Sequence, residues 1–443
     1  MSAARGGVEF QIVPHPSPTP PASAVPNPRP WLLLFIAVCL VAANLRMTIT
    51  GVGPLLEDIS EGLGVPVAAL GALGSIPLIT WAAISPLAHV LSERLGIERA
   101  IGWSLVVLAA GTAWRSFPGS AVNLWAGTVI IGAGLAICNV LIPAIIKQDF
   151  PTRLPFVMGA YTAILSASAS LSAGFAVPIS DIDTGSGPLG WRFALLASGI
   201  AIPFGLVAWI AATWGSAKRR AAETAALDAG SDAARAASDP ASASSDDGTS
   251  NSGRRIWRDP VAWLVACYMG TQSLNFYVLS TWLAPFLTSL GYPPAAAGLA
   301  LMAFQALGIV GSLAAPSLMQ SRVSRWAPAL LPVLGLIAWI GMPILPGAMP
   351  IWIVCGGLVC GAQLTVSVTL MAVRARTRSA ASALSGMSQS VGYLIAATGP
   401  ILFGLLHGLT GSWGLAFAFV CAVTATQLAI GAAVGRPRFV LDR

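Results

Sequence analysis

The sequence of 443 residues carries very little charge: 9% of its residues are Asp, Glu, Lys or Arg, while 56% are hydrophobic. Soluble globular chains carry about 25% charged residues. A chain of this size cannot bury so much apolar surface and cover the remainder with so few charges. The composition therefore excludes a soluble enzyme, and the high apolar fraction excludes a disordered or collagen-like chain. A polytopic, all-α membrane protein fits it.

Acidic residues, histidines and paired cysteines are missing from the apolar runs. All 17 Asp and Glu residues fall in loops or at the ends of runs, and the six cysteines show no C-x-x-C spacing. The three histidines lie in the N-terminal tail or at the ends of runs, at His15, His89 and His407. These absences argue against a metal site, a cofactor, a proton-coupled exporter built on an intramembrane carboxylate, and a membrane-embedded enzyme.

Apolar segments long enough to span a membrane recur from Trp31 onward. Twelve spans are predicted, at about 31–53, 67–91, 98–117, 121–146, 156–179, 191–214, 260–288, 295–319, 327–345, 350–372, 381–406 and 413–434. Residues 1–30 are polar and contain eight prolines, so they are predicted to be a disordered cytoplasmic tail. Residues 215–258 turn abruptly to Ala, Ser, Asp and Arg and are predicted to be a cytoplasmic linker between six-helix bundles at 31–214 and 259–435, with a short tail at 436–443.

The distribution of basic residues predicts the orientation. The net charge of +7 is spread singly or in small groups between the apolar runs, which is typical of loop anchors rather than of a nucleic-acid surface. With both termini in the cytoplasm, 21 of the 24 Lys and Arg residues fall on the cytoplasmic side. Only Arg115 and Arg192 then lie outside, and Arg46 lies within a span.

The two halves of the chain repeat each other. At a constant offset of 231 residues, three identities relate the first span to the seventh: Asn44 with Asn275, Pro54 with Pro285, and Leu56 with Leu287. At an offset of 229, Gly132-Ala133 matches Gly361-Ala362 in the fourth and tenth spans. These matches predict two six-helix bundles related by a pseudo-twofold axis along the membrane normal.

Arg46 is the only charge predicted at membrane depth. An arginine at the centre of a membrane helix costs roughly 2.5–3.5 kcal/mol on insertion scales. It is either a structural residue paired with carbonyl groups or the anchor of an anion site in a water-filled cavity. The lack of any membrane carboxylate to neutralise it favours the anion site, and a guanidinium presents a planar fork to small anions or electron-rich planar groups.

Polar and aromatic residues at helical spacing predict the rest of the cavity wall. Tyr277 occupies the repeat position of Arg46 and is expected to face it across the axis. For each candidate the alternative is a hydrogen bond between helices. The alternating serines at 166, 168, 170 and 172 are interpreted as close-packing residues. The other candidates are Asn44, Asn139, Tyr161, Gln272, Asn275, Phe276, Gln305, Gln363, Gln389 and Tyr393.

Several segments resemble the cyanate and 2-nitroimidazole permease branch of the major facilitator superfamily. They include N-L-R-x(7)-P-L-L at 44–56, GLAICNVLIPAIIKQDFP at 134–151 and LSGMSQSVGYLIAATGP at 384–400. The segment SPLAHVLSERLG departs from the superfamily's usual loop, because Ser85 and His89 stand where Gly and Asp are expected. The resemblance implies a twelve-helix carrier, expected to be a monomer, for small planar or anionic solutes in a bacterial inner membrane. The rival interpretation is an efflux carrier for neutral aromatic compounds.

The predicted linker is expected to be dispensable for transport. Its composition cannot bury enough apolar surface to fold, and a coil of this length reaches about 35–40 Å, enough to join the two bundles. Replacing residues 222–250 with a Gly/Ser segment should leave the transport rate within a few-fold. Loss of transport by a variant that still expresses and inserts normally would contradict this expectation.

Overall fold

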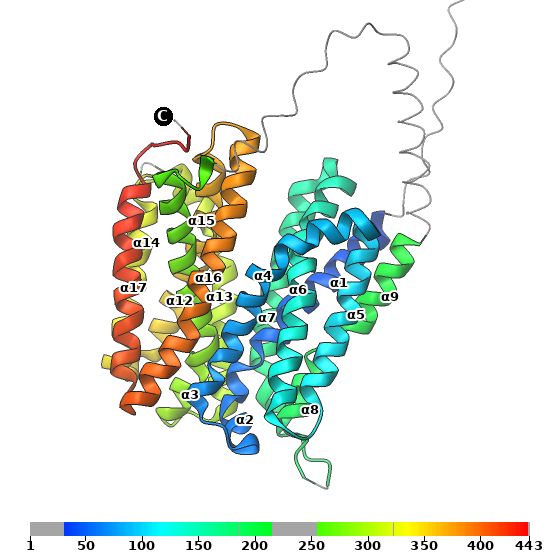
Figure 1. The fold of residues 1–443 in the computed structure, drawn as a ribbon. Coiled ribbons are helices and arrows are strands. Elements are labelled where there is room, and N and C mark those ends of the chain that lie inside the picture. The colour runs from blue at the N-terminus through cyan, green and yellow to red at the C-terminus, as the bar shows by residue number, and fades with distance from the viewer. Residues whose placement is uncertain (1–30, 186, 215–254, 322, 442–443) are drawn as a thin grey trace, which may run out of the picture.

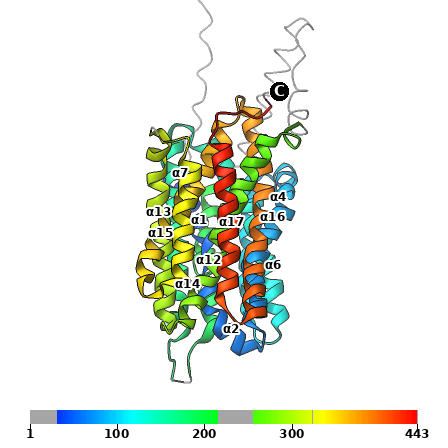
Figure 2. The same cartoon turned by 90° about the vertical axis from the view of Figure 1, so that its left-hand side faces the viewer.

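The computed structural model describes residues 31–185, 187–214, 255–321 and 323–441. These residues are almost entirely helical and form two bundles, which stand side by side in Figure 1. Figure 2 shows the C-terminal bundle from its outer side, with α14 and α17 in front. The protein therefore has the all-α, two-bundle architecture that its apolar runs and internal repeat predict.

The N-terminal bundle contains counterparts of the first six predicted spans. Its elements are α1 (Trp31–Thr50), η1 (Gly53–Leu55), α2 (Leu56–Leu63), α3 (Val67–Leu70), α4 (Ala72–Leu95), α5 (Ile97–Ser116), α6 (Ala121–Asp149), η2 (Pro151–Arg153), α7 (Leu154–Ser180), α8 (Gly190–Ala197) and α9 (Ala201–Thr213). The sixth span is broken into α8 and α9 rather than continuous. Helix α1 ends just before a Gly-Val-Gly-Pro sequence, which is a poor helix former.

The C-terminal bundle contains counterparts of the other six spans. Its elements are α12 (Pro260–Ser289), α13 (Pro294–Gln320), α14 (Ala327–Ile344), η3 (Pro346–Ala348), α15 (Met349–Val373), α16 (Arg378–Thr410) and α17 (Trp413–Val434). Side-chain caps fix several starts: Asp259 accepts from two backbone N–H groups of α12, Thr377 caps α16 and Ser412 caps α17.

Ten helical segments of the described chain are long and apolar enough to cross a membrane by length and composition alone. Helices α5 and α12 are not among them, although they occupy the third and seventh predicted spans. Helix α12 carries many polar residues, and most of its length is buried against other helices. A helix enclosed by protein does not need an apolar surface all round, which explains its lower hydropathy.

The predicted tail and linker fall largely outside the described residues, which leave out 1–30 and 215–254. The C-terminal segment is described as far as residue 441, and it packs against the bundle. The backbone N–H of Val440 donates to the Arg374 carbonyl at 2.9 Å, and that of Leu441 donates to the Asp259 carboxylate at 2.6 Å. Val440 is buried in the core of the C-terminal bundle. The described part of the C-terminal segment is therefore packed against the end of the C-terminal bundle.

The two bundles meet at the end of the molecule away from the C-terminus, and Figure 1 shows them spreading apart toward the other end. Two hydrogen bonds join them on the closed side. Thr288 of α12 donates to the Glu57 carboxylate of α2 at 2.5 Å, and Ser170 of α7 donates to the Met302 carbonyl of α13 at 2.7 Å. Together with the packing of α3 and α4 on α16, these contacts form the seal between the bundles.

Gly404 permits the close approach of three helices in this seal. A Cβ at this position would lie 2.8 Å from the Ala68 carbonyl oxygen of α3 and would overlap the Trp282 ring of α12. Neither a backbone carbonyl nor a buried indole can move aside easily. A glycine is therefore needed for the bundles to close at this point.

Gly404→Ala is expected to open the seal. Overpacking a tight contact costs about 1–3 kcal/mol, which would shift the equilibrium away from the closed arrangement. The measurement is maleimide labelling, in detergent, of a cysteine placed at Thr281, which is buried beside Gly74 of α4. Labelling should accelerate several-fold with Gly404→Ala. Gly386→Ala is the control, because a Cβ there meets nothing within 4 Å; equal labelling in both would contradict the assignment.

Candidate functional site

A cavity of about 140 Å³ lies between the two bundles. At about 10–15 Å³ per water molecule on this measure, it has room for roughly ten waters or a solute of similar size. Its wall comes from α1 and α7 of the N-terminal bundle and from α12, α13, α15 and α16 of the C-terminal bundle. The polar and aromatic residues of the wall are Arg46, Thr162, Ser166, Gln272, Ser273, Phe276, Tyr277, Phe304, Gln305, Ser312, Cys360 and Tyr393.

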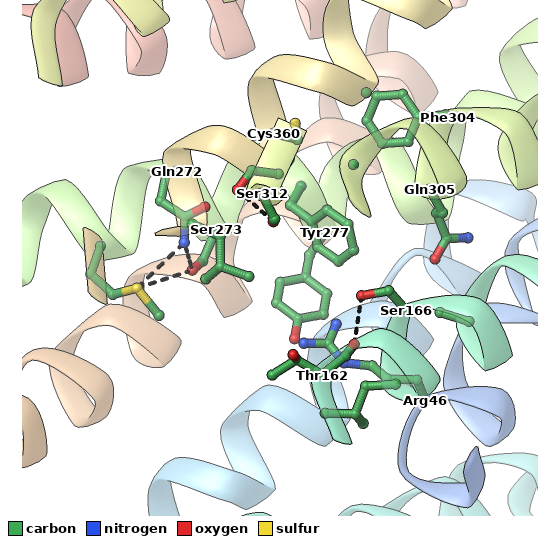
Figure 3. Close-up of a pocket in the computed structure, with 18 of the residues that line it drawn as sticks. Arg46, Thr162, Ser166, Gln272, Ser273, Tyr277, Phe304, Gln305, Ser312 and Cys360 are labelled. Carbon is green, nitrogen blue, oxygen red and sulfur yellow. Dashed lines mark hydrogen bonds between the residues drawn. The ribbon is translucent and has the colours of Figure 1, made fainter. Parts of the chain in front are cut away.

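Arg46 is the one charged residue in the described wall of this cavity. Its guanidinium carbon lies 5.6 Å from the centre of the Phe276 ring and 5.8 Å from that of Tyr277. Figure 3 shows the Tyr277 hydroxyl pointing at the guanidinium. Tyr277 therefore lies where its repeat position predicts, and the two aromatic faces partly compensate the charge.

A cluster of aromatic rings holds Tyr277 in place. The centre of its ring lies 5.2 Å from that of Phe276 and 6.5 Å from that of Trp81. Trp81 of α4 also packs edge-on against Tyr393 of α16, with 5.4 Å between ring centres. Edge-to-face pairs at these distances stabilise ring orientation. Trp81 was not singled out from the sequence, because one tryptophan in an apolar span shows no pattern that separates it from a core residue.

The described structure gives no hydrogen bond from the Arg46 guanidinium to a backbone carbonyl, and no carboxylate lies in the described cavity wall. Arg46 is half-buried, so its charge reaches the cavity from a wall that is otherwise uncharged. This placement favours the anion-site interpretation of Arg46 over the structural one. It also leaves the guanidinium fork able to take a partner inside the cavity.

Six predicted residues lie in the cavity wall and six do not. In the wall are Arg46, Gln272, Phe276, Tyr277, Gln305 and Tyr393; elsewhere are Asn44, Asn139, Tyr161, Asn275, Gln363 and Gln389. The amide of Asn275 donates to Thr424 and Gln427 of α17, at 3.0 and 3.4 Å. Gln389 is exposed and donates to Ser385 one turn earlier on α16 at 3.0 Å.

The wall also contains residues that are not among the twelve predicted cavity residues. Thr162, Ser166 and Ala169 of α7 line it at helical spacing, and this spacing is the signal that identifies them. The packing interpretation of the serines is confirmed for Ser170 and Ser172, since Ser172 donates to the Met47 carbonyl at 2.7 Å and Ser170 joins the bundles. For Ser166 it is wrong, because this residue lines the cavity.

Arg115, one of the two basic residues expected on the outer side, lies in the last turn of α5, and its side chain is only 1% exposed. Its guanidinium donates to the Thr48 carbonyl at 2.8 Å, to Ser198 Oγ at 3.4 Å and to the Leu195 carbonyl at 3.5 Å. The ends of α1 and α8 leave carbonyl groups that need donors, and Arg115 supplies them. A count of basic residues along the sequence cannot distinguish a buried arginine that joins two helix ends from an exposed arginine in a loop.

Two helical bundles around a solute-sized cavity define a membrane transporter. The family model of the Major Facilitator Superfamily matches residues 34–397, and the chain belongs to this superfamily. It is therefore a multi-pass secondary transporter and not an enzyme.

Related proteins match nearly the whole chain. The 2-nitroimidazole transporter of Escherichia coli K12 is 32% identical over 408 residues, covering 92% of this chain and 96% of its own. The cyanate transport protein CynX of the same organism is 26% identical over 400 residues, covering 88% and 94%. A bacterial homologue of the lysosomal transporter Spinster, solved in an inward-facing unoccupied conformation, has the same fold, with a TM-score of 0.68, 18% identity and coverage of 93% and 94%.

Arg115→Ala is expected to destabilise the protein without weakening solute binding. It removes the guanidinium that donates to the Thr48 carbonyl at 2.8 Å and bridges α1 to α8, and charged hydrogen bonds of this kind are worth about 1.5–3 kcal/mol. The melting temperature of the purified variant measures the loss. Arg192→Ala is the control, because Arg192 was expected at the same end of the molecule and stacks on Trp191 at 4.3 Å instead of bridging helices. Equal melting temperatures in the two variants would contradict a stabilising role for the Arg115 hydrogen bonds.

Proposed function

We propose that this protein carries a small planar solute, anionic or electron-rich, across the bacterial inner membrane by alternating access. The observation that carries the proposal is Arg46, an unneutralised cation in the wall of a small cavity, flanked by two aromatic rings. Arg46 is the electrostatic anchor of the solute. Tyr277, Phe276 and Gln272 shape the site around it, and Tyr393 supports them through Trp81.

The energetics favour an anionic partner. Keeping an arginine at membrane depth costs roughly 2.5–3.5 kcal/mol, and cation–π contacts return about 0.5–2 kcal/mol. A hydrogen bond to a charged group adds about 1.5–3 kcal/mol. The aromatic rings therefore stabilise the Arg46 charge only in part. A bound anion would supply the remaining stabilisation.

The size and shape of the cavity support a small, flat solute. Its volume of about 140 Å³ has room for a solute of the size of roughly ten water molecules. The faces of Phe276 and Tyr277 suit a planar group lying against them. The names of two relatives, a 2-nitroimidazole transporter and a cyanate transport protein, describe small solutes. We extend that size class, and not either compound, to this chain.

The orientation completes the proposed mechanism. With both termini in the cytoplasm, as the basic residues predict, the seal around Gly404 lies on the outer side and the bundles spread toward the cytoplasm. The conformation described is then the inward-facing state of a monomeric carrier in the lipid bilayer. Opening of the seal and closure at the opposite end would expose Arg46 to the outside, which is the essential step of alternating access.

A neutral aromatic solute is the second candidate, because four aromatic rings line the cavity and Arg46 can also polarise a nitro or carbonyl group. Proteoliposome uptake separates the two. Cyanate and small planar carboxylates are measured beside neutral nitroaromatics of similar size. Uptake of the anions supports the proposal, whereas uptake restricted to the neutral compounds replaces it with the second candidate.

Arg46→Ala is expected to weaken binding of the transported anion roughly 10- to 150-fold, the equivalent of one charged hydrogen bond. Arg46→Lys keeps the charge but loses the planar fork, so it should retain part of the affinity. The dissociation constant and the melting temperature are measured on the same purified variants. Arg115→Ala should show the opposite pattern, with lower stability and unchanged affinity. A stable Arg46→Ala protein with unchanged affinity would refute the role of Arg46.

A further inference from the structure

Gln305 of α13 is an unusual member of the cavity wall. It is 5% exposed, and neither its Nε2 nor its Oε1 has a hydrogen-bond partner. Figure 3 shows its side chain at the edge of the cavity, on the opposite bundle from Arg46. Buried polar groups are nearly always paired, and each exception in a native structure needs an explanation.

Three other neutral polar groups of the wall are satisfied within the protein, and the Tyr277 hydroxyl, which has no hydrogen-bond partner, points at the Arg46 guanidinium. Gln272 donates to Ser273 Oγ at 2.6 Å, Ser312 to the Gly361 carbonyl at 2.9 Å, and Ser166 to the Thr162 carbonyl at 3.1 Å. Among the described residues of the wall, Gln305 alone has two buried side-chain polar atoms without partners. A leucine in its place would avoid the cost of an unpaired amide in a membrane protein.

We infer that Gln305 is a specificity-determining residue that recognises a donor–acceptor edge on the transported solute. This inference rests on the proposed function, in which Arg46 holds the anionic group. A glutamine amide presents an N–H donor and a carbonyl acceptor side by side in one plane. The complementary solute is a planar anion whose far edge carries one donor and one acceptor, as in an azole ring or a primary amide.

The arrangement of the two residues adds a consequence. Arg46 belongs to the N-terminal bundle and Gln305 to the C-terminal bundle. A solute that reaches both side chains is therefore held by both bundles at once, whereas an anion without the donor–acceptor edge engages Arg46 and leaves the amide unpaired. The terminal torsion of a glutamine is soft, so the amide can turn toward the solute without moving α13.

Two probes of matched size test this inference. Pyrazole-4-carboxylate and thiophene-3-carboxylate are both planar five-membered-ring anions, but only the pyrazole has an N–H donor beside a nitrogen acceptor. The wild-type protein should bind the pyrazole about tenfold more tightly, the effect of one or two buried hydrogen bonds. Gln305→Leu should abolish this preference, and Arg46→Ala should weaken both probes alike.

Gln389→Leu is the matched control, because Gln389 lies outside the cavity wall and its amide is already paired with Ser385 at 3.0 Å. It should keep the preference for the pyrazole. The melting temperature gives a second readout: Gln305→Leu should be at least as stable as the wild type, since it removes an unpaired buried amide. A merely structural glutamine would instead lower the melting temperature when replaced.

The outcomes separate this inference from the proposed function. If the wild type shows no preference, or if Gln305→Leu retains it, the role of Gln305 is overturned while the anchoring role of Arg46 stands on its own measurement. If Arg46→Ala binds both probes as the wild type does, or if the wild type binds neither, the proposed function fails and the role of Gln305 fails with it.

Discussion

A membrane interior offers no water to a polar side chain, so every such group needs a partner inside the protein. This constraint organises the structure around Arg46, whose charge meets aromatic faces on one side and the cavity on the other. The same requirement explains Arg115, which lies wholly in the N-terminal bundle and donates to carbonyls at the ends of two helices. The two arginines of this chain thus keep their charge in two different ways: Arg115 bridges backbone carbonyls, and Arg46 faces a cavity.

The fold follows from the sequence to a large extent because it depends on two coarse signals. Long apolar runs predict the helices, and a repeat at one constant offset predicts two similar bundles. The repeat also placed Tyr277 opposite Arg46, since equivalent positions of two bundles face each other near their common axis. The broken sixth span and the packed segment around Val440 were not predicted, because both depend on contacts between segments far apart in the sequence.

The site was predicted only in part, and the two asparagines of the repeat show why. Asn44 lies against Gly205 of α9, and Asn275 donates to Thr424 of α17. Each asparagine faces the sixth helix of its own bundle and turns away from the cavity. Their matching positions therefore reflect the same packing role in both bundles and no shared binding role. Spacing along a helix shows which residues share a face, but it does not show whether that face meets another helix or the cavity.

The hydrogen bond between Thr288 and Glu57 joins two positions that are 231 residues apart, the same separation as Arg46 and Tyr277. A contact between equivalent positions lies close to the pseudo-twofold axis, so this axis runs through both the seal and the cavity. In a dimer of two identical six-helix chains, both contacts would pair a residue with its own copy. Arginine would then face arginine and glutamate would face glutamate, and like charges would repel in a medium of low dielectric constant. Joining the bundles in one chain allows each of these positions to differ, so a cation can face an aromatic ring and a carboxylate can face a hydroxyl. The asymmetry of the binding site is thus a direct benefit of having both halves on a single polypeptide.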